Sequence, residues 1–581
     1  MKKKIQTVDL YTPEGEKFVS ERPSTPWNVY PRPSLVRDSF FCLNGTWKLL
    51  ARKGEKKLYD GEIIVPFVPE SALSGVCEVF PEGTKLYYMR KFSLPEDFCA
   101  DGGRVILHFG AVDQISQVRF NGKVLGQHRG GYHSFSFDVT DSVADNNVLE
   151  VSVIDELDKK ILPYGKQCRK RGGMWYTPVS GIWQTVWLEC VPENYIKNIK
   201  IVTDEHGADV YALGEGNLSG MVELGNERFY MKDGHARINV KEPRYWSPED
   251  PYLYEIRVRT GKDVVSSYFA LRTLEIAEAG GKKRLLLNGK TCFFHGLLDQ
   301  GYFSDGIFLP ADVSGYERDI CEAKRLGFNM LRKHIKVEPE VFYYLCDKLG
   351  IVVFQDMVNN SDYSFIRDTA LPTVGIKSLD DKKLHRCEKS REAFLSEMEE
   401  TVNKLSFHPS VCYYTIFNEG WGQFDHAAAY EKLRSIDDTR FIDSVSGWFV
   451  PKGNDELCSD VESIHVYFKE IKLSEFKTDK PKILSEFGGY SLKYEGHSFN
   501  LKKNYGYRTF KEKKDFEAAL EKLYKTQVIP LIKEGLCASV YTQLTDVEDE
   551  TNGLMTYDRK IVKVGESLMQ GIAKDIRDTT K

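Results

Sequence analysis

The sequence predicts a multidomain protein in which two β-sandwiches precede a C-terminal (β/α)8 TIM barrel. The chain has 581 residues, which is too long for one ordinary domain. Short alternating strands with turn signals fill residues 30–276, whereas strands alternate with helices after residue 285. We therefore expect an N-terminal jelly-roll domain over 1–192, an immunoglobulin-like sandwich over 193–276 and a (β/α)8 barrel over 277–581.

The jelly-roll prediction depends on a series of short strand patterns with no convincing helix between them. The expected strands cover residues 86–92, 104–109, 117–120, 148–154 and 182–189. Asn121-Gly122 follows the third of them and is typical of a tight hairpin turn. A sandwich of the jelly-roll type fits this succession of strands.

The second sandwich is predicted from four further strand patterns, at residues 198–202, 236–240, 254–258 and 265–270. About 80 residues of short strands fit an immunoglobulin-like sandwich. No Cys–Trp–Cys pattern marks an antibody-type domain, so the prediction concerns the architecture alone.

The barrel prediction is clearest in one strand–helix–strand unit. It joins a strand at 328–332, a helix at 339–349 and a strand at 351–355. Pro339 at the first turn and Gly350 just past the end are the expected boundaries of the helix. A stretch of mixed composition at 357–386 follows the second strand, and we interpret it as a long functional loop at the barrel rim.

Composition excludes several classes of protein. The chain is 41% apolar and 28% charged with a net charge of −5, and its Lys and Arg are scattered, so no nucleic acid partner is expected. The three lysines after Met1 precede no apolar stretch of signal-peptide length, and no run of about 18 apolar residues predicts a membrane span. The twelve cysteines form no C-x-x-C pair, which indicates free thiols in the cytoplasm.

Two glutamates at the ends of apolar strand patterns carry the functional prediction. Glu419 ends the run that begins at Val411 and is followed by Gly420, while Glu486 ends the run from Pro481 and precedes Gly488 by two positions. Barrel enzymes keep their active sites at the C-terminal ends of the strands. Two carboxylates facing one pocket are the minimum equipment for hydrolysis of a glycosidic bond.

Short motifs along the whole chain carry a family resemblance. They are Leu43-Asn-Gly-Thr-Trp47, Gly130-Gly-Tyr-His-Ser-Phe-Ser-Phe-Asp138, Gly181-Ile-Trp-Gln-Thr-Val-Trp187, Tyr245-Trp-Ser-Pro248, Pro251-Tyr-Leu-Tyr254, Leu287-Asn-Gly-Lys290, His408-Pro-Ser410, Asn418-Glu419 and Glu486. In this order the motifs resemble glycoside hydrolase family 2, the β-galactosidase, β-glucuronidase and β-mannosidase group. The resemblance implies a retaining β-glycosidase with Glu419 as acid/base and Glu486 as nucleophile.

Residues next to the two glutamates are candidate substrate contacts. In the enzymes that this chain resembles, an asparagine at the place of Asn418 reaches the sugar 2-hydroxyl with its amide, and an arginine at the place of Arg332 supports the nucleophile. For Arg332, a structural ion pair with Asp356 is the alternative. Tyr467 ends a strand pattern and is expected to donate its hydroxyl to Glu486.

Five further residues are candidates for the rim of the pocket. His465 is expected either to contact the site or to be a core histidine, and His334 follows Arg332 in a motif that departs from the family pattern. Trp421 would stack on a sugar or cap the barrel. Asp299 and Gln543 complete the set.

The identity of the sugar stays open at this point. The Asn-x-Lys motif of family β-glucuronidases is missing from 546–555, and Asn500-Leu-Lys502 lies too close to Glu486 to replace it. A neutral sugar such as galactose is the default, and a hexuronide held by Arg332 or Lys333 is the alternative.

Other classes of function remain as alternatives to an active glycosidase. An inactive carbohydrate-binding barrel would not need both glutamates, and a metal-dependent hydrolase would need a ligand cluster that the spacing of the 12 His and 12 Cys does not offer. Some family members use Mg²⁺ or Na⁺, but no matching ligands are identified, and no cofactor is implied. We expect a small glycoside or oligosaccharide as substrate and a homo-oligomer.

Overall fold

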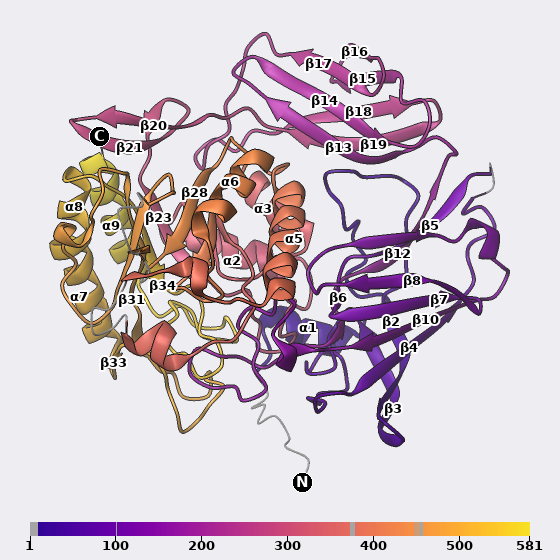
Figure 1. Ribbon diagram of the computed structural model, residues 1–581, viewed down its shortest axis with the longest axis horizontal. Helices are drawn as coiled ribbons and strands as arrows, with labels where there is room; N and C mark the ends of the chain where they lie inside the picture. The colour runs from indigo at the N-terminus through magenta and orange to yellow at the C-terminus, as the bar shows by residue number, and fades with distance from the viewer. Residues whose placement is uncertain (1–9, 100–101, 372–377, 448–449, 452–456, 581) are drawn as a thin grey trace.

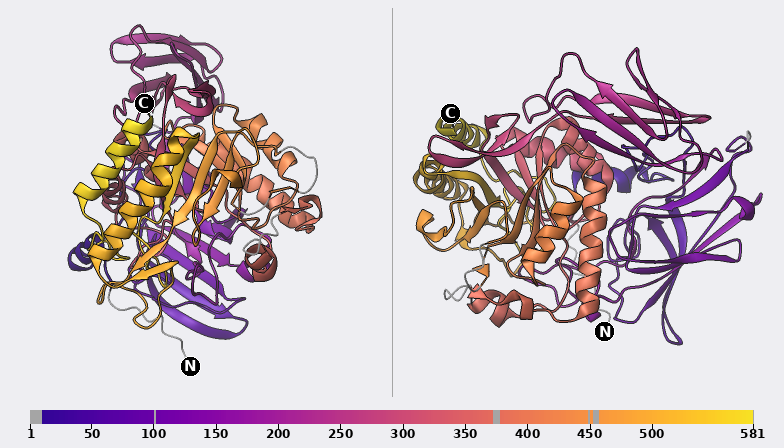
Figure 2. Two further views of the ribbon diagram at one scale, coloured as in Figure 1. Left: turned by 90° about the vertical axis from the view of Figure 1, so that its left-hand side faces the viewer. Right: turned by 45° about the horizontal axis from the view of Figure 1, so that its top comes forward.

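The computed structural model describes residues 10–99, 102–371, 378–447, 450–451 and 457–580. Its three parts follow one another along the chain (Figure 1): an N-terminal sandwich, a second sandwich and a barrel that lies beside both. The views in Figure 2 show the long helix α5 (Glu388–Leu405) on the side of the barrel that faces the first sandwich. The predicted fold class is confirmed.

The first sandwich consists of a six-stranded antiparallel sheet in the order β3-β2-β4-β10-β7-β8 and a four-stranded sheet in the order β1-β12-β5-β9. Its strands are β1 (Phe41–Cys42), β2 (Gly45–Lys53), β3 (Lys56–Val65), β4 (Lys85–Phe92), β5 (Arg104–Phe109), β6 (Val112–Asp113), β7 (Ile115–Phe120), β8 (Lys123–Arg129), β9 (Phe135–Asp138), β10 (Asn147–Ile154), β11 (Gly181–Ile182) and β12 (Val186–Val191). In β10, Leu149, Val151 and Val153 alternate with half-exposed residues, so one face fills the core between the sheets.

The second sandwich packs a three-stranded sheet, β13-β14-β17, against a four-stranded sheet, β16-β15-β18-β19. The strands are β13 (Ile196–Thr203), β14 (Gly207–Gly214), β15 (Gly220–Leu224), β16 (Glu227–Met231), β17 (His235–Asn239), β18 (Tyr254–Thr260) and β19 (Asp263–Phe269). Val210, Val222, Ile238 and Val258 are fully buried between the two sheets. The hairpin of β20 (Leu274–Ala279) and β21 (Lys282–Leu287), with β22 (Lys290–Thr291), leads into the barrel.

Eight parallel strands form the barrel in the order β28-β27-β25-β24-β23-β34-β31-β30, and β28 and β30 touch to close it. The strands are β23 (Phe294–Asp299), β24 (Met330–Lys333), β25 (Val352–Asp356), β27 (Val411–Asn418), β28 (Phe441–Ser446), β30 (Glu462–Val466), β31 (Lys482–Gly488) and β34 (Leu536–Thr542). The helices are α2 (Ser314–Arg325), α3 (Glu340–Leu349), α5, α6 (His426–Ile436), α7 (Lys513–Leu523), η6 (Tyr524–Val528), α8 (Ile529–Lys533) and α9 (Glu566–Thr580). Because the strands are parallel, their C-terminal ends meet on one rim.

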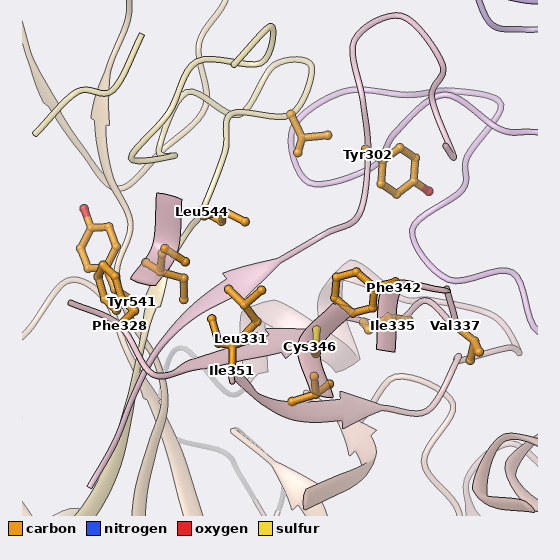
Figure 3. Close-up of a cluster of buried hydrophobic side chains, with 14 of the residues drawn as sticks. Tyr302, Phe328, Leu331, Ile335, Val337, Phe342, Cys346, Ile351, Tyr541 and Leu544 are labelled. Atoms are coloured by element: carbon orange, nitrogen blue, oxygen red, sulfur yellow. The ribbon is translucent and has the colours of Figure 1, made fainter. Parts of the chain in front are cut away.

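Alternation along β24 decides which side chains enter the barrel. Leu331 lies in the hydrophobic cluster between the strands and α3, with Phe342 and Cys346 (Figure 3). Since successive side chains of a strand point to opposite faces, Arg332 points into the barrel and Lys333 points back towards the helices. The ammonium of Lys333 accordingly lies 4.2 Å from the ring centre of Phe342 on α3.

Three details differ from the sequence analysis. Helix α1 (Pro13–Glu21) was not predicted, although its N-cap Thr12 followed by a proline is a start signal. The expected strand at 182–189 divides into β11 and β12, which belong to different sheets. The prediction that all cysteines are free is wrong for Cys99 and Cys190, which form a disulfide; the other ten are not disulfide-bonded.

The long stretch after β25 contains the π-helix η3 (Ile366–Ala370), β26 (Ser378–Leu379) and the 3-10 helix η4 (Asp381–Lys383). Residues 372–377 of the predicted loop lie outside the described residues. β26 pairs in parallel with the short strand β29 (Val450–Pro451). Of the helices in the described ranges, none is long and apolar enough to cross a membrane.

Candidate active site

The two glutamates singled out in the sequence face each other across the barrel rim. Glu419 directly follows β27, and Glu486 lies near the end of β31. A carboxylate oxygen of each lies within 4.8 Å of the other, with a ring nitrogen of His465 in the same group. This separation suits carboxyl groups about 5–5.5 Å apart, the geometry of glycosidases that retain configuration.

Glu419 is held in an unusual backbone conformation. Its φ is +51°, in the left-handed region that side chains other than glycine enter at a cost of roughly 1–2 kcal/mol. The backbone N–H donates to the Ser446 carbonyl at 2.8 Å, which anchors the turn to β28. The side chain is 12% exposed, and His465 Nδ1 lies 2.8 Å from its Oε1. The turn thus directs a carboxyl group with one exposed edge towards Glu486.

Glu486 lies among donors and positive charge. Arg332 Nη1 donates to its Oε1 at 3.1 Å, Tyr467 donates its hydroxyl to Oε2, and His465 Nδ1 lies 3.6 Å from Oε2. Burial alone would raise the pKa of Glu486, but His465 and Arg332 outweigh burial and lower the pKa to about 2 from the ordinary 4.5. The carboxylate is therefore ionised throughout the neutral range, as a nucleophile requires.

Arg332 connects three parts of the site. Its guanidinium donates from Nε to Asp356 Oδ1 at 3.0 Å and from Nη2 to Asn418 Oδ1 at 2.8 Å, besides its contact with Glu486. The sequence left an ion pair with Asp356 and a position near Glu486 as alternatives for Arg332, and the structure shows both contacts. Removing one partner of such a buried charge network leaves the others unpaired and costs about 3–5 kcal/mol, so replacing Arg332 alone would destabilise the rim.

The variant Tyr467→Phe tests whether the tyrosine hydroxyl helps to lower the pKa of Glu486. Replacing Tyr467 by Phe removes a donor to the carboxylate, so the pKa of Glu486 should rise from about 2 towards 4.5. A glutamate with a lowered native pKa adds stability above pH 4.5 that is lost as the pH falls through 2. We expect the acidic limb of kcat/KM to move to higher pH in Tyr467→Phe, with kcat about tenfold lower. Tyr494→Phe, a half-buried control, should leave the profile unchanged; an unmoved limb in Tyr467→Phe would contradict this role.

His334 supports Asp356 and does not touch either glutamate directly. Its Nδ1 lies 2.7 Å from Asp356 Oδ2. Burial and the nearby Lys166 lower the pKa of His334, although its hydrogen bond with Asp356 acts in the opposite sense. Arg332 and His334 outweigh the effect of burial on Asp356 and hold its pKa below the ordinary value. A direct contact between His334 and substrate stays a prediction.

Two buried N–H groups beside Glu419 have no partner in the described chain. Asn418 accepts from Arg332 through its oxygen, which leaves Nδ2 as an unused donor, and the indole Nε1 of Trp421 is also unpaired. A buried donor without an acceptor costs about 1–3 kcal/mol, so both are suited to bind oxygens of a ligand. Trp421, Trp175 and Tyr363 form an aromatic wall. The Trp421 ring stacks on Trp175 with ring centroids 5.4 Å apart and meets Tyr363 edge-on with centroids 5.7 Å apart.

Two of the rim candidates are occupied by protein partners. Asp299 accepts from Lys333 at 2.6 Å, on the helix-facing side of the barrel wall. Gln543 accepts from Gln300 and donates to Glu550 and Asn552. Lys333 also donates to Glu338 at 2.9 Å, so its ammonium is not available for a substrate carboxylate. Substrate contacts by Asp299 and Gln543 remain predictions without a contact that supports them.

A metal could be held at one place in the described ranges. Glu419, His465 and Glu486 form the one group of three ligand atoms close enough together. The neighbouring cation Arg332 and the hydrogen bond from Tyr467 already neutralise Glu486, which makes a divalent ion between the carboxylates unfavourable.

Some residues that reach the site from outside the barrel strands were not predicted from the sequence. Residues 155–180, between β10 and β11, cross from the sandwich to the rim, where Tyr164 N–H donates to the Asn359 carbonyl and Thr177 N–H to Glu548. The ring of Tyr507, which precedes β33 (Arg508–Phe510), stacks on Tyr467 at 3.7 Å. No local pattern identifies such residues, because their partners lie far away in sequence.

Comparisons with known proteins agree with this architecture. Family models match three consecutive parts of the chain: residues 76–171 (glycosyl hydrolase 2 galactose-binding domain-like), 191–272 (glycosyl hydrolases family 2) and 280–561 (glycosyl hydrolases family 2, TIM barrel domain). The fold and the paired carboxylates define a sandwich–sandwich–barrel protein with a glycosidase-type site. The chain belongs to glycoside hydrolase family 2.

Individual relatives are distant. A β-galactosidase of Thermoanaerobacter pseudethanolicus is 25% identical over 47% of this chain and 39% of its own length. A β-glucuronidase of Bacteroides fragilis is 23% identical over 80% of this chain and 71% of its own length. The chain thus spans well under two thirds of the first of these relatives.

Solved structures share the fold at low identity. A β-galacturonidase of Eisenbergiella tayi bound to galacturonate has a TM-score of 0.68 at 18% identity, covering 94% of this chain and 98% of its own. A β-glucuronidase of an uncultured Clostridium has a TM-score of 0.70 at 19% identity, covering 95% of this chain and 99% of its own.

Proposed function

We propose that this protein is a retaining exo-β-glycosidase that removes terminal β-linked sugars through a glycosyl-enzyme intermediate. The observation that carries the proposal is the pair of buried carboxylates within 4.8 Å, one of them ionised and the other free of any lysine or arginine partner in the described chain. Membership of the family supports the same class of activity. Cleavage at chain ends fits a rim that the sandwich loop 155–180 partly covers.

The reaction would proceed in two displacements. The Glu486 carboxylate attacks the anomeric carbon, the bond to the leaving oxygen breaks, and Glu419 gives its proton to that oxygen. Glu419, now ionised, takes a proton from water, whose oxygen attacks the anomeric carbon and releases Glu486. Asn418 Nδ2 would donate to a sugar hydroxyl during both steps, and Tyr467 would keep Glu486 anionic.

The substrate proposed is a small glycoside or oligosaccharide. A β-galactoside is the default from the sequence, whereas the lysine that lies beside Trp421 in the site favours a β-hexuronide. We further propose that the protein is a homo-oligomer and acts in the cytoplasm, where ten cysteines outside any disulfide fit a reducing environment. The Cys99–Cys190 disulfide favours an oxidising compartment instead. Counting the thiols of the purified protein decides between the two compartments.

A panel of chromogenic β-glycosides tests the proposed function. We expect turnover of one preferred sugar among galactoside, glucuronide, galacturonide, mannoside, glucoside and arabinoside. The first product should be the β-anomer, because two inversions restore the configuration. The rate should not change after treatment with chelator, since Arg332 and Tyr467 already hold the Glu486 carboxylate. An α-anomer as first product, or activity that chelation abolishes and a metal restores, would contradict the proposal.

A further inference from the structure

The loop between β10 and β11 carries a lysine into the candidate site. Lys166 is 6% exposed, and its position is fixed by its carbonyl, which accepts from Tyr176 N–H at 3.0 Å. Tyr176 in turn donates its hydroxyl to Glu550 on the barrel at 3.1 Å. The backbone around Lys166 is therefore tied to the barrel rim and not only to the sandwich.

The Lys166 ammonium lies against the residue that follows the acid/base turn. Its Nζ is 4.5 Å from the ring centre of Trp421, two residues after Glu419. Lys166 is also near enough to contribute, after burial, to the lowered pKa of His334. Burial raises the pKa of Glu550 to about 7, although Lys166 acts in the opposite sense. The ammonium thus lies between the aromatic wall and the charged rim.

Among the cations around the two glutamates, Lys166 differs in having no acceptor. Arg332 is bonded to Asp356 and Glu486, and Lys333 to Asp299 and Glu338. The Lys166 ammonium makes no hydrogen bond or ion pair with any residue of the described ranges. The residue is 6% exposed and its nitrogen keeps some access to solvent, so the cation–π contact with Trp421, worth about 0.5–2 kcal/mol, leaves the ammonium available to an anion.

We propose that Lys166 is the specificity-determining residue that binds an anionic group of the substrate, a carboxylate such as that of a hexuronic acid. The unpaired indole N–H of Trp421 is a second donor in contact with the same lysine. This inference rests on the proposed glycosidase function and names the class of its substrate. The cation that binds the carboxylate thus comes from the sandwich domain and not from the barrel strands, where Arg332 and Lys333 are occupied.

The test compares charged and neutral substrates in three variants. For Lys166→Met we expect KM for a chromogenic β-galacturonide or β-glucuronide to rise about tenfold or more, while kcat/KM for the β-galactoside changes less than about twofold. Lys166→Arg, which keeps the charge, should restore part of the binding of the uronide. The control Lys170→Met removes an exposed lysine of the same loop and should change neither substrate.

Binding of free sugars gives a readout that does not need turnover. Titration of the wild-type protein with galacturonate or glucuronate should change its tryptophan fluorescence, since Trp421 lies under the ammonium, and Lys166→Met should bind them about tenfold more weakly. Equal losses for charged and neutral ligands would overturn the inference and leave the glycosidase proposal intact. No preference for uronates in the wild type would also overturn it. Absence of all glycosidase activity together with Lys166-dependent uronate binding would contradict the proposed function alone.

Discussion

Replacement of Glu486 by Gln is expected to abolish turnover while the protein stays folded. The amide keeps the size of the side chain and its contact with Tyr467, but it lacks the negative charge that attacks the anomeric carbon. We expect kcat to fall by roughly 10⁴-fold or more, measured with the preferred sugar of the glycoside panel.

A matched variant separates chemistry from folding in that experiment. Glu495→Gln makes the same change at an exposed residue nine positions further along the chain and should keep full activity. Loss of the Glu486 charge also leaves Arg332 with one fewer partner, so the melting temperature of both variants is measured. Full activity in Glu486→Gln with an unchanged melting curve would remove Glu486 from the mechanism.

Replacement of Glu419 by Ala has the second large effect, and its size depends on the leaving group. With a glycoside that needs protonation of its leaving oxygen, kcat/KM should fall by about 10²–10⁴-fold. With a 2,4-dinitrophenyl leaving group, which departs without a proton, formation of the glycosyl-enzyme should be nearly unchanged and its hydrolysis should become slow. Added azide should then accelerate turnover, because azide attacks without a general base.

The outcome for Glu419 distinguishes acid/base chemistry from a structural role. A structural role would reduce the rates with both leaving groups equally and would give no response to azide. The exposed Glu392 on α5 provides the control, since Glu392→Ala removes a carboxylate from the helix that precedes β27 and should not alter either rate.

Local patterns in the sequence predicted the core of the site and much of the fold. Apolar runs ending in Glu419 and Glu486 place both carboxylates on one rim, because the barrel strands are parallel. The hydroxyl contact from Tyr467 to Glu486 also agrees with its expected place at a strand end. The alternation of apolar residues along β10 is likewise a local signal, and so are the boundaries of α3 at Pro339 and Gly350.

Features that depend on distant contacts escaped prediction. Lys166 looks like an ordinary loop lysine until the fold brings it against Trp421, 255 positions later in the chain. The Cys99–Cys190 bond joins residues 91 positions apart that meet only when the sandwich forms. Lys333, a candidate for the substrate carboxylate, points the opposite way because it alternates with Arg332 on β24.

The most direct test of the central claim is mass spectrometry of the protein after treatment with a 2-deoxy-2-fluoro β-glycoside of the preferred sugar. The fluorine slows both steps, and a reactive leaving group lets the glycosyl-enzyme form and accumulate. We predict one added sugar mass per chain, on the peptide that contains Glu486, and no labelling of Glu486→Gln. A label on another residue, or inactivation without any covalent sugar, would contradict the assignment of Glu486 as nucleophile.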